Sequence, residues 1–318
     1  MDINKDHPLV SVCVVTYNSS NTIIETLQSI LLQTYPNIEL VVSDDASTDD
    51  TIDKCQKWIE KNGQRFVRTS VFTVSENKGV AANVNRALNE AHGEWIKSIA
   101  GDDLLTEDCV DIYMRYIKAH PEFEVLFARV KKFKVQDEKI KILGISPSFE
   151  DQKYFDYYNQ LPSYQKYREM LENGIKVQSP TIFVKKSVFE MIKFPEEYRF
   201  MEDHPMWLRM AKNGVNIYMV PEVTVLYRIG NSLSKNVDEF FYSRLHMASQ
   251  SLFFWNECRQ YYIDENIEKG YNRNMKLLLK YEMIEAFTQN KVSFKNKIIR
   301  RFVFNIVNKF AHFELPNK

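Results

Sequence analysis

Residues 10–49 read VSVCVVTYNSSNTIIETLQSILLQTYPNIELVVSDDASTD. Two short apolar runs rich in β-branched residues, at 10–16 and 38–43, enclose a segment with helical periodicity. A strand, a helix and a second strand in this order form the unit from which parallel sheets are built. The pattern therefore predicts an α/β fold with a Rossmann-like, mostly parallel central sheet flanked by helices.

The same alternation continues to residue 103. We expect a helix ending near 60, a strand over 66–74, a helix over 79–91 and a strand over 95–100. After residue 103 we expect another helix and strand over 106–130, and then an inserted tyrosine-rich helical segment over 149–173. A strand over 175–184 around Pro180 and a helix over 201–213 are expected next. Strands over 216–220 and 223–227 and helices after 238 complete the prediction.

The bulk composition narrows the function classes. The 318 residues are 44% hydrophobic and include 42 basic and 42 acidic residues, so the net charge does not indicate a nucleic-acid partner. The four cysteines form no CxxC pair and are expected to be reduced thiols. The N-terminus lacks a signal-peptide pattern and no apolar run reaches about twenty residues. These features predict a cytoplasmic protein without a spanning helix.

Two acidic clusters follow predicted strands, at the edge where ligands bind in open α/β sheets. Asp44 and Asp45 end the second strand, where a carboxylate can accept hydrogen bonds from a base or a ribose, or can cap the next helix. Asp102 and Asp103 follow Gly101 after the fourth strand. Adjacent carboxylates there suit Mg²⁺ or Mn²⁺ on a substrate diphosphate, although an ordinary acidic turn has the same composition.

A third acidic cluster, Glu202-Asp203-His204, opens a predicted helix. A carboxylate at this position can take a proton from an attacking hydroxyl, or can simply interact with the helix dipole. His204 is a weaker candidate for a ligand or a second base. None of the nine glycines has GxG spacing and there is no GxxxxGK[ST], which argues against dehydrogenases and P-loop NTPases. A sugar nucleotidyltransferase would have a glycine-rich loop where TYNSSN stands at 16–21.

Residues 8 to about 234 resemble the family 2 glycosyltransferases, which have the GT-A fold. Three blocks in the expected order carry the resemblance: SVCVVTYNSSNTIIETLQSILLQTYPNIELVVSDDASTDDT at 11–51, ENKGVAANVNRALNEAHGEWIKSIAGDD at 76–103, and MEDHPMWLRMAKNG at 201–214. The resemblance implies a catalytic domain over 1–234, with a nucleotide-binding half (8–103) and an acceptor half (104–234). A helical C-terminal region over 235–318 follows.

The resemblance also assigns roles to residues. It implies Asp203 as the general base, and Asp102 and Asp103 as the metal-binding motif, in which Ala100 replaces the usual first acid. Arg228 is the second residue of YRIGNSLS at 227–234, which resembles the loop that closes over the donor diphosphate, but is one residue shorter and lacks its histidine. The nucleotide-sugar residues implied are Thr16, Tyr17, Glu25, Asp44, Asp45, Asn77, Gly79, Asn83, Asp102 and Arg228.

The resemblance implies an inverting transfer of one sugar per cycle from a nucleotide-sugar to a glycan acceptor. UDP is the nucleotide that members of the family commonly use. The QxxRW motif of processive synthases is absent. Many relatives extend lipid-linked oligosaccharides for O-antigen or capsule, so the implied partner is such an acceptor. A binding or scaffold protein that has lost transfer is the alternative, favoured by Ala100 and the shortened loop.

The segment 291–313 predicts a basic amphipathic helix. It contains six lysines or arginines and no acid, with large apolar residues at four-residue spacing: Phe294, Ile298, Phe302, Ile306 and Phe310. Such a helix lies on an anionic membrane surface, here the inner face of the cell membrane, or packs on the catalytic domain.

Overall fold

The computed structural model describes residues 7–137, 139–174, 177–198, 201, 203–230, 248–289, 305–307, 309 and 311–313. The chain divides into two compact units. The first comprises Met1–Tyr167, Lys176–Glu196 and Met206–Gly230, and the second Arg168–Ile175, Glu197–Pro205 and Asn231–Lys318.

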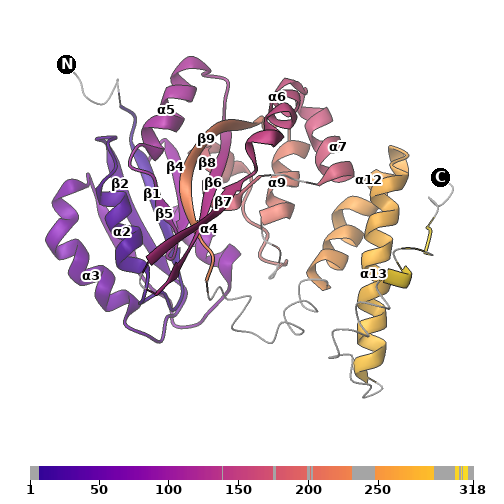
Figure 1. The fold of residues 1–318 in the computed structure, drawn as a ribbon, viewed down its shortest axis with the longest axis horizontal. Coiled ribbons are helices and arrows are strands. Elements are labelled where there is room, and N and C mark those ends of the chain that lie inside the picture. The colour runs from indigo at the N-terminus through magenta and orange to yellow at the C-terminus, as the bar shows by residue number, and fades with distance from the viewer. Residues whose placement is uncertain are drawn as a thin grey trace. The chain divides into compact units, whose positions relative to one another are not determined.

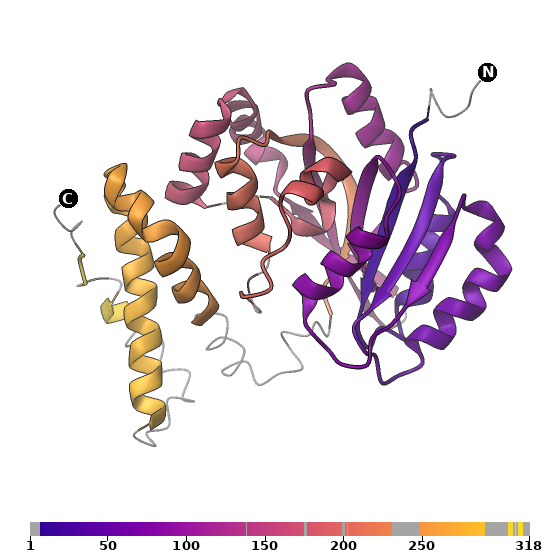
Figure 2. The same ribbon diagram turned by 180° about the vertical axis from the view of Figure 1, so that it is seen from behind.

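The first unit is a nine-stranded, mostly parallel sheet of order β3-β2-β1-β4-β8-β6-β9-β5, with β7 paired to β6. Figures 1 and 2 show helices on both faces of this sheet, as the sequence predicts for a GT-A fold. The strands are β1 (Val10–Thr16), β2 (Ile38–Asp44), β3 (Thr69–Phe72), β4 (Trp95–Ala100), β5 (Leu104–Leu105), β6 (Val125–Gln136), β7 (Lys139–Ser146), β8 (Phe183–Lys185) and β9 (Ile217–Arg228).

The main core lies on one face of β1, because successive side chains of a strand point to opposite faces. Val10, Val12 and Val14 are fully buried against helix α2 (Ile23–Leu31), helix α3 (Thr51–Asn62) and helix α5 (Cys109–Ala119). On the opposite face, the Cys13 thiol contacts the Ala87 carbonyl of helix α4 (Val80–Glu90). Both faces of the sheet are therefore covered.

The parallel register aligns the ends of three strands. Thr16 is the Cα partner of Asp44, and Val15 is the partner of Ala100. The loops that follow β1, β2 and β4 consequently begin at one edge of the sheet, where the sequence predicts the ligand site.

Two sequence predictions about the second half are wrong, and one hairpin was not predicted. The segment around Pro180 is a 3₁₀ helix, Ser179–Thr181, followed by the short β8, because the fixed φ of proline suits the first turn of a helix. The two strands expected over 216–220 and 223–227 are one strand, Ile217–Arg228, in which Pro221 lies at a register shift and its carbonyl accepts from Arg129. The β6–β7 hairpin was not predicted, because alternating lysines there resemble an exposed surface.

The inserted segment is helical, as predicted. Helix α6 (Gln152–Gln160) and helix α7 (Ser163–Asn173) follow a short 3₁₀ turn at Phe149–Asp151. Helix α8 (Lys186–Met191) and helix α9 (Asp203–Lys212) complete the helices that precede β9.

The second unit contains additional C-terminal helices. A π-helical turn (Phe254–Cys258) leads into α12 (Arg259–Asp264) and then α13 (Glu268–Gln289). Phe254 packs against the rings of Tyr262 and Tyr271. Gly270 makes this packing possible, because a Cβ there would lie 2.3 Å from the Tyr262 ring.

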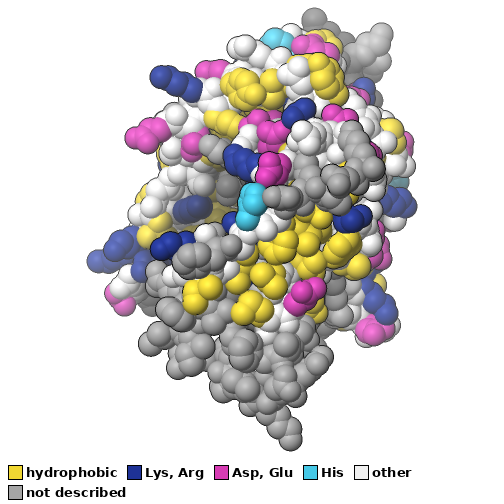
Figure 3. Space-filling view, turned by 90° about the vertical axis from the view of Figure 1, so that its right-hand side faces the viewer, with side chains coloured by type: hydrophobic (Ala, Val, Ile, Leu, Met, Phe, Trp, Pro, Cys, Tyr) yellow, Lys and Arg dark blue, Asp and Glu magenta, His cyan; other side chains and the backbone are white. Residues whose placement is uncertain are grey.

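The predicted amphipathic helix at 291–313 lies outside the described residues, apart from 305–307, 309 and 311–313, and stays a prediction. In Figure 3, hydrophobic side chains gather on one face of the molecule beside atoms that are not described. None of the helices within the described ranges has both the length and the hydrophobicity to cross a membrane.

Candidate active site

The loops that follow β1 and β2 are held together by hydrogen bonds. The Asn18 backbone N–H donates to Ser47 Oγ at 2.7 Å, and the Thr48 N–H donates to Asn18 Oδ1 at 2.8 Å. The Ser19 N–H donates to Thr51 Oγ1 at 2.8 Å. The polar residues after the first strand therefore fix the loop beside Asp44 and Asp45. Tyr17, which is partly buried, lies at the start of this loop.

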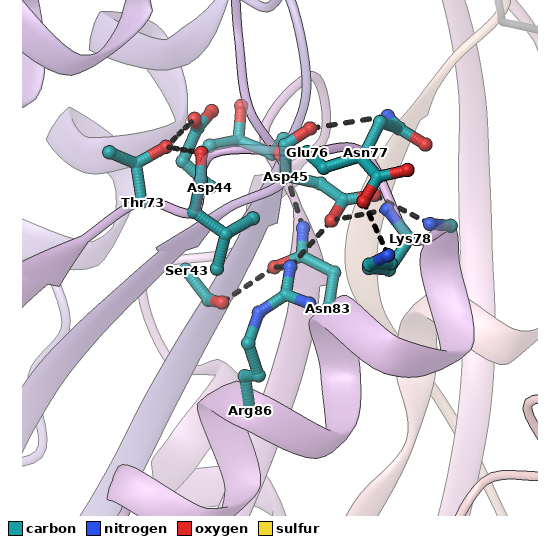
Figure 4. Close-up of polar contacts among 12 residues, drawn as sticks. Ser43, Asp44, Asp45, Thr73, Glu76, Asn77, Lys78, Asn83 and Arg86 are labelled. Atoms are coloured by element: carbon teal, nitrogen blue, oxygen red, sulfur yellow. Dashed lines mark hydrogen bonds and ion pairs between the residues drawn. The ribbon is translucent and has the colours of Figure 1, made fainter.

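Asp44 and Asp45 are both buried and both have protein partners (Figure 4). Asp44 Oδ2 accepts from Thr73 Oγ1 at 2.6 Å and from the Ser47 N–H at 2.8 Å. Asp45 accepts from the Gly79 N–H at 2.7 Å and pairs with Arg86 at 2.6 Å. These carboxylates order the edge of the sheet, and Asp45 anchors the start of α4.

Three further predicted nucleotide-site residues join this network. Asn77 Nδ2 donates to the Asp45 carbonyl at 3.2 Å, and Gly79 adopts a φ of 92°, which glycine favours. Asn83 accepts from Ser43 Oγ at 2.5 Å and donates to the Thr16 carbonyl at 3.1 Å. The side chain of Asn83 thereby connects the ends of β1 and β2, as Figure 4 shows for its contact with Ser43.

Gly101 brings the end of β4 close to the end of β1. A Cβ at this position would lie 2.7 Å from Thr16 Oγ1, a distance that side chains essentially never adopt. The Gly101 N–H donates to the Val15 carbonyl at 3.0 Å, and its own carbonyl accepts from Thr22 Oγ1 at 2.9 Å. The Thr16 hydroxyl is buried and has no hydrogen-bond partner among the described residues. It is thus a buried polar group next to Gly101 at the start of the acidic motif.

Arg228, at the end of β9, binds the acidic motif directly. Its backbone N–H donates to Asp103 Oδ1 at 2.9 Å, and its Nε donates to the Asp102 carbonyl at 2.8 Å. Its Nη2 pairs with Glu25 Oε2 of α2 at 2.5 Å. The guanidinium also lies over the Phe133 ring, 4.7 Å from its centroid. Predicted site residues far apart in the sequence therefore meet in one cluster.

Asp102 and Asp103 differ in access. Asp103 is 1% exposed, whereas Asp102 is only partly buried. Burial, and then the neighbouring Asp102 charge, raise the pKa of Asp103 to about 8. Burial also raises the pKa of Asp102. The more accessible Asp102 is the better placed of the two to reach a ligand.

The carboxylates of Asp102 and Asp103 suit a divalent cation that also binds a substrate. Two adjacent carboxylates whose ionised forms are disfavoured by burial gain from a nearby positive charge. The described residues include no group of three or more His, Cys, Asp or Glu side chains that could hold an ion alone. Mg²⁺ and Mn²⁺ sites built from one or two carboxylates plus substrate phosphates need no such group.

Lys97 was not identified from the sequence as a site residue. It lies in the middle of β4, fully buried, and its Nζ donates to the carbonyls of Pro180 at 2.5 Å and Ser98 at 2.6 Å. Burial lowers its pKa to about 8. The lysine inside the apolar run WIKSIA was the sequence signal for a buried charge. The alternation of apolar and polar residues along the strand could not show which groups it contacts.

Asp203 is the first residue of helix α9 and is grouped with the second unit. Its Oδ1 accepts from the His204 backbone N–H at 2.7 Å. Glu202 lies outside the described residues. The assignment of Asp203 as general base stays a prediction.

The chain is similar in sequence to known proteins. The family model described as glycosyl transferase family 2 matches residues 11–192. The chain is 30% identical over 230 residues to the "Putative teichuronic acid biosynthesis glycosyltransferase TuaG" of Bacillus subtilis (strain 168), covering 72% of this chain and 82% of TuaG. It is 27% identical over 231 residues to the "UDP-Glc:alpha-D-GlcNAc-diphosphoundecaprenol beta-1,3-glucosyltransferase WfaP" of Escherichia coli, covering 72% of this chain and 80% of WfaP.

Solved structures show the same fold. S. aureus TarS 1–349 in complex with UDP-GlcNAc has a TM-score of 0.57 and 20% identity, over 94% of this chain and 81% of TarS. The mannosyltransferase PcManGT from Pyrobaculum calidifontis, in complex with GDP-Man and Mn²⁺, has a TM-score of 0.54 and 17% identity, over 95% of this chain and 88% of PcManGT.

Proposed function

Because the chain belongs to glycosyl transferase family 2 and is a glycosyltransferase with the GT-A fold, we propose that it transfers one sugar from a UDP-sugar to a hydroxyl of a lipid-linked glycan. The proposed transfer inverts the anomeric carbon and serves the synthesis of a surface polysaccharide, such as O-antigen or capsule. TarS with UDP-GlcNAc and the name of WfaP support the donor and the acceptor class.

The cluster around Arg228 carries this proposal. It joins Asp102, Asp103 and Glu25 at the edge of the sheet where the strands β1, β2 and β4 end. Asp102 would hold Mn²⁺ or Mg²⁺, with Asp103 behind it, and the ion would neutralise charge on the departing diphosphate. The Arg228 guanidinium adds a fork of donors that suits phosphate oxygens.

The nucleotide would bind at the ends of β1 and β2. In this proposal Thr16, Tyr17, Asp44 and Asn83 surround the base and ribose, with Asn77 and Gly79 at the loop before α4. Asp45 contributes by holding that loop, since its carboxylate is already bound to the Gly79 N–H and to Arg86. The buried Thr16 hydroxyl, which has no hydrogen-bond partner among the described residues, lies at the edge of this region.

Asp203 would act as the general base in this reaction. Its carboxylate would accept the proton of the acceptor hydroxyl while that oxygen attacks the anomeric carbon from the face opposite the diphosphate. Attack on that face inverts the configuration, so an α-linked donor would yield a β-linkage. The segment 291–313 would hold the enzyme at the inner membrane face.

A donor panel tests the proposal. UDP-, GDP- and dTDP-sugars would be incubated with the protein and Mn²⁺, and the released nucleotide measured. We expect release from UDP-sugars, faster with a lipid-diphosphate-linked acceptor and absent in EDTA. Tight donor binding without any release, with or without acceptor, would instead indicate a scaffold protein that has lost transfer.

A further inference from the structure

The β6–β7 hairpin exposes an unusual number of large apolar side chains. Val135 is 51% exposed, Ile140 65%, Ile142 51% and Leu143 44%, all within nine residues of sequence, 135–143. Single exposed apolar residues are common on protein surfaces, but contiguous ones mark surfaces that bind a partner. The fold gains little from these four side chains, because they remain in water.

The strand register collects three of these side chains, Val135, Ile140 and Ile142, on one face. Val135 pairs with Ile140, and Phe133 pairs with Ile142. The pairs Lys134 with Lys141 and Gln136 with Lys139 alternate with them and therefore point to the opposite face. A register shift after Lys132 leaves Leu143 as an extra residue in β7. The hairpin thus has an apolar face and a basic face.

Charge identifies the kind of surface that fits the hairpin. Residues 131–143 contain five lysines and two acidic residues, Asp137 and Glu138. The two-stranded hairpin is thin, so lysines on its outer face stay within about one Debye length, roughly 10 Å, of a surface touched by its apolar face. An apolar face with excess lysines complements the acyl boundary and anionic head groups of a membrane.

A second copy of the chain fits this surface less well. Within the described residues β7 pairs only with β6, so its outer edge could in principle pair with another β7. That pairing would bring Lys139 and Lys141 of two copies together, and lysines on an edge strand oppose such association.

The hairpin is continuous with the acidic cluster. Phe133 of β6 pairs with Arg228 of β9 and lies beneath its guanidinium, and the Ile229 N–H donates to the Phe133 carbonyl at 2.7 Å.

A cavity of about 450 Å³ opens at the base of the hairpin and is lined by Lys132, Leu143, Gly144, Ser148, Asp151 and Gln178. This volume lies in the range of small-ligand sites. Figure 1 shows β7 beside β6 in this part of the sheet.

We propose that the β6–β7 hairpin is a membrane-contact element, which rests its apolar face on an anionic lipid surface and so brings the acidic cluster to a lipid-linked acceptor. The second half of this inference rests on the proposed function. The contact itself does not, and it is independent of the segment 291–313.

Vesicle sedimentation of the full chain tests the proposal. Vesicles of equal parts phosphatidylglycerol and phosphatidylcholine would be compared with phosphatidylcholine alone. We expect the wild type to pellet with the anionic vesicles at low salt. Ile140→Ser with Ile142→Ser, and separately Lys134→Gln with Lys139→Gln and Lys141→Gln, should each reduce partitioning about tenfold.

Control variants replace exposed residues elsewhere in the first unit. Val67→Ser removes an apolar side chain that is 64% exposed, and the triple change Lys57→Gln, Lys61→Gln, Lys118→Gln removes three exposed lysines. The controls should pellet like the wild type. All variants should keep UDP-sugar hydrolysis, because none of these residues lies in the donor site.

Three outcomes would overturn the proposal. Hairpin variants that pellet like the wild type would assign any membrane contact to another segment. A wild type that stays in solution would remove the contact altogether. A concentration-dependent dimer that only the hairpin variants lose, without vesicle binding, would make this face an interface between copies. Vesicle binding that follows the hairpin, without any UDP-sugar hydrolysis, would refute the proposed function and leave the membrane contact standing.

Discussion

The backbone N–H of Arg228 donates to Oδ1 of Asp103 at 2.9 Å, across 125 residues of sequence. This hydrogen bond connects the end of β9 to the acidic motif after β4. It also positions the Arg228 backbone, and the Nη2 of its side chain pairs with Glu25. One residue thereby holds two carboxylates in place while keeping a cation at the edge of the sheet.

Replacing Arg228 with lysine should weaken donor binding. The backbone bond to Asp103 remains, but the planar fork that contacts the Asp102 carbonyl and Glu25 is lost. We expect the KM for the UDP-sugar to rise about tenfold with a smaller change in kcat, measured by nucleotide release at increasing donor concentration. Arg115→Lys, at an exposed ion pair with Glu222, is the control and should leave both constants unchanged. An unchanged KM for Arg228→Lys would remove this side chain from the donor site.

Local periodicity predicted the first half of the fold well. The predicted bounds of β1 and β4 agree with the structure, because a buried strand of a parallel sheet is a continuous apolar run that ends at polar residues. The same reasoning missed β7, whose alternating lysines and isoleucines are exposed on both faces. It also placed a strand at Pro180, where the backbone forms a helical turn.

The acidic clusters could be predicted from sequence, but their partners could not. Asp45 pairs with Arg86, which lies 41 residues away on α4. Lys97 donates to the Pro180 carbonyl, 83 residues away. Such pairs depend on which loops and strands become neighbours in the folded sheet, and residue spacing along the chain does not contain that information.

Asp102 and Asp103 should respond differently to truncation. Asp103→Ala removes a buried acceptor of the Arg228 N–H, so the free energy of unfolding in urea should fall by about 1–3 kcal/mol. Asp102→Ala should change stability much less. Both variants should lose the Mn²⁺-dependent part of donor binding, measured by titration calorimetry with and without EDTA. Full activity of both variants in EDTA would contradict the metal assignment.

Asp203→Asn should separate chemistry from binding. Asparagine keeps the size of the side chain and an oxygen that can accept from the His204 N–H, but it cannot take a proton from the acceptor. Turnover should fall about 10²- to 10⁴-fold while the donor dissociation constant stays within a factor of about two. Near-normal turnover would move the base to another carboxylate, and Glu202 of the same block would be tested next.

Lys97→Met should change how stability depends on pH. The lysine is fully buried, and burial lowers its pKa from 10.5 to about 8. Between these two values the unfolded chain binds a proton that the folded protein has released, so the stability of the wild type should rise with pH in this window. The rise attributable to Lys97 is about 3 kcal/mol from pH 7.5 to pH 10.5.

The difference in unfolding free energy between the wild type and Lys97→Met removes the groups that titrate alike in both proteins. It retains Lys97 and the coupled change at Asp103, whose pKa the Lys97 charge lowers. Methionine has a similar length but leaves the carbonyls of Ser98 and Pro180 without their donor, so the variant should also be less stable at high pH. Urea denaturation at intervals across this pH range measures the difference. A difference in unfolding free energy that stays constant from pH 7.5 to pH 10.5 would contradict this prediction. Lys97 would then stay protonated in the folded protein across this range, with its ammonium group held by its two hydrogen bonds to carbonyls.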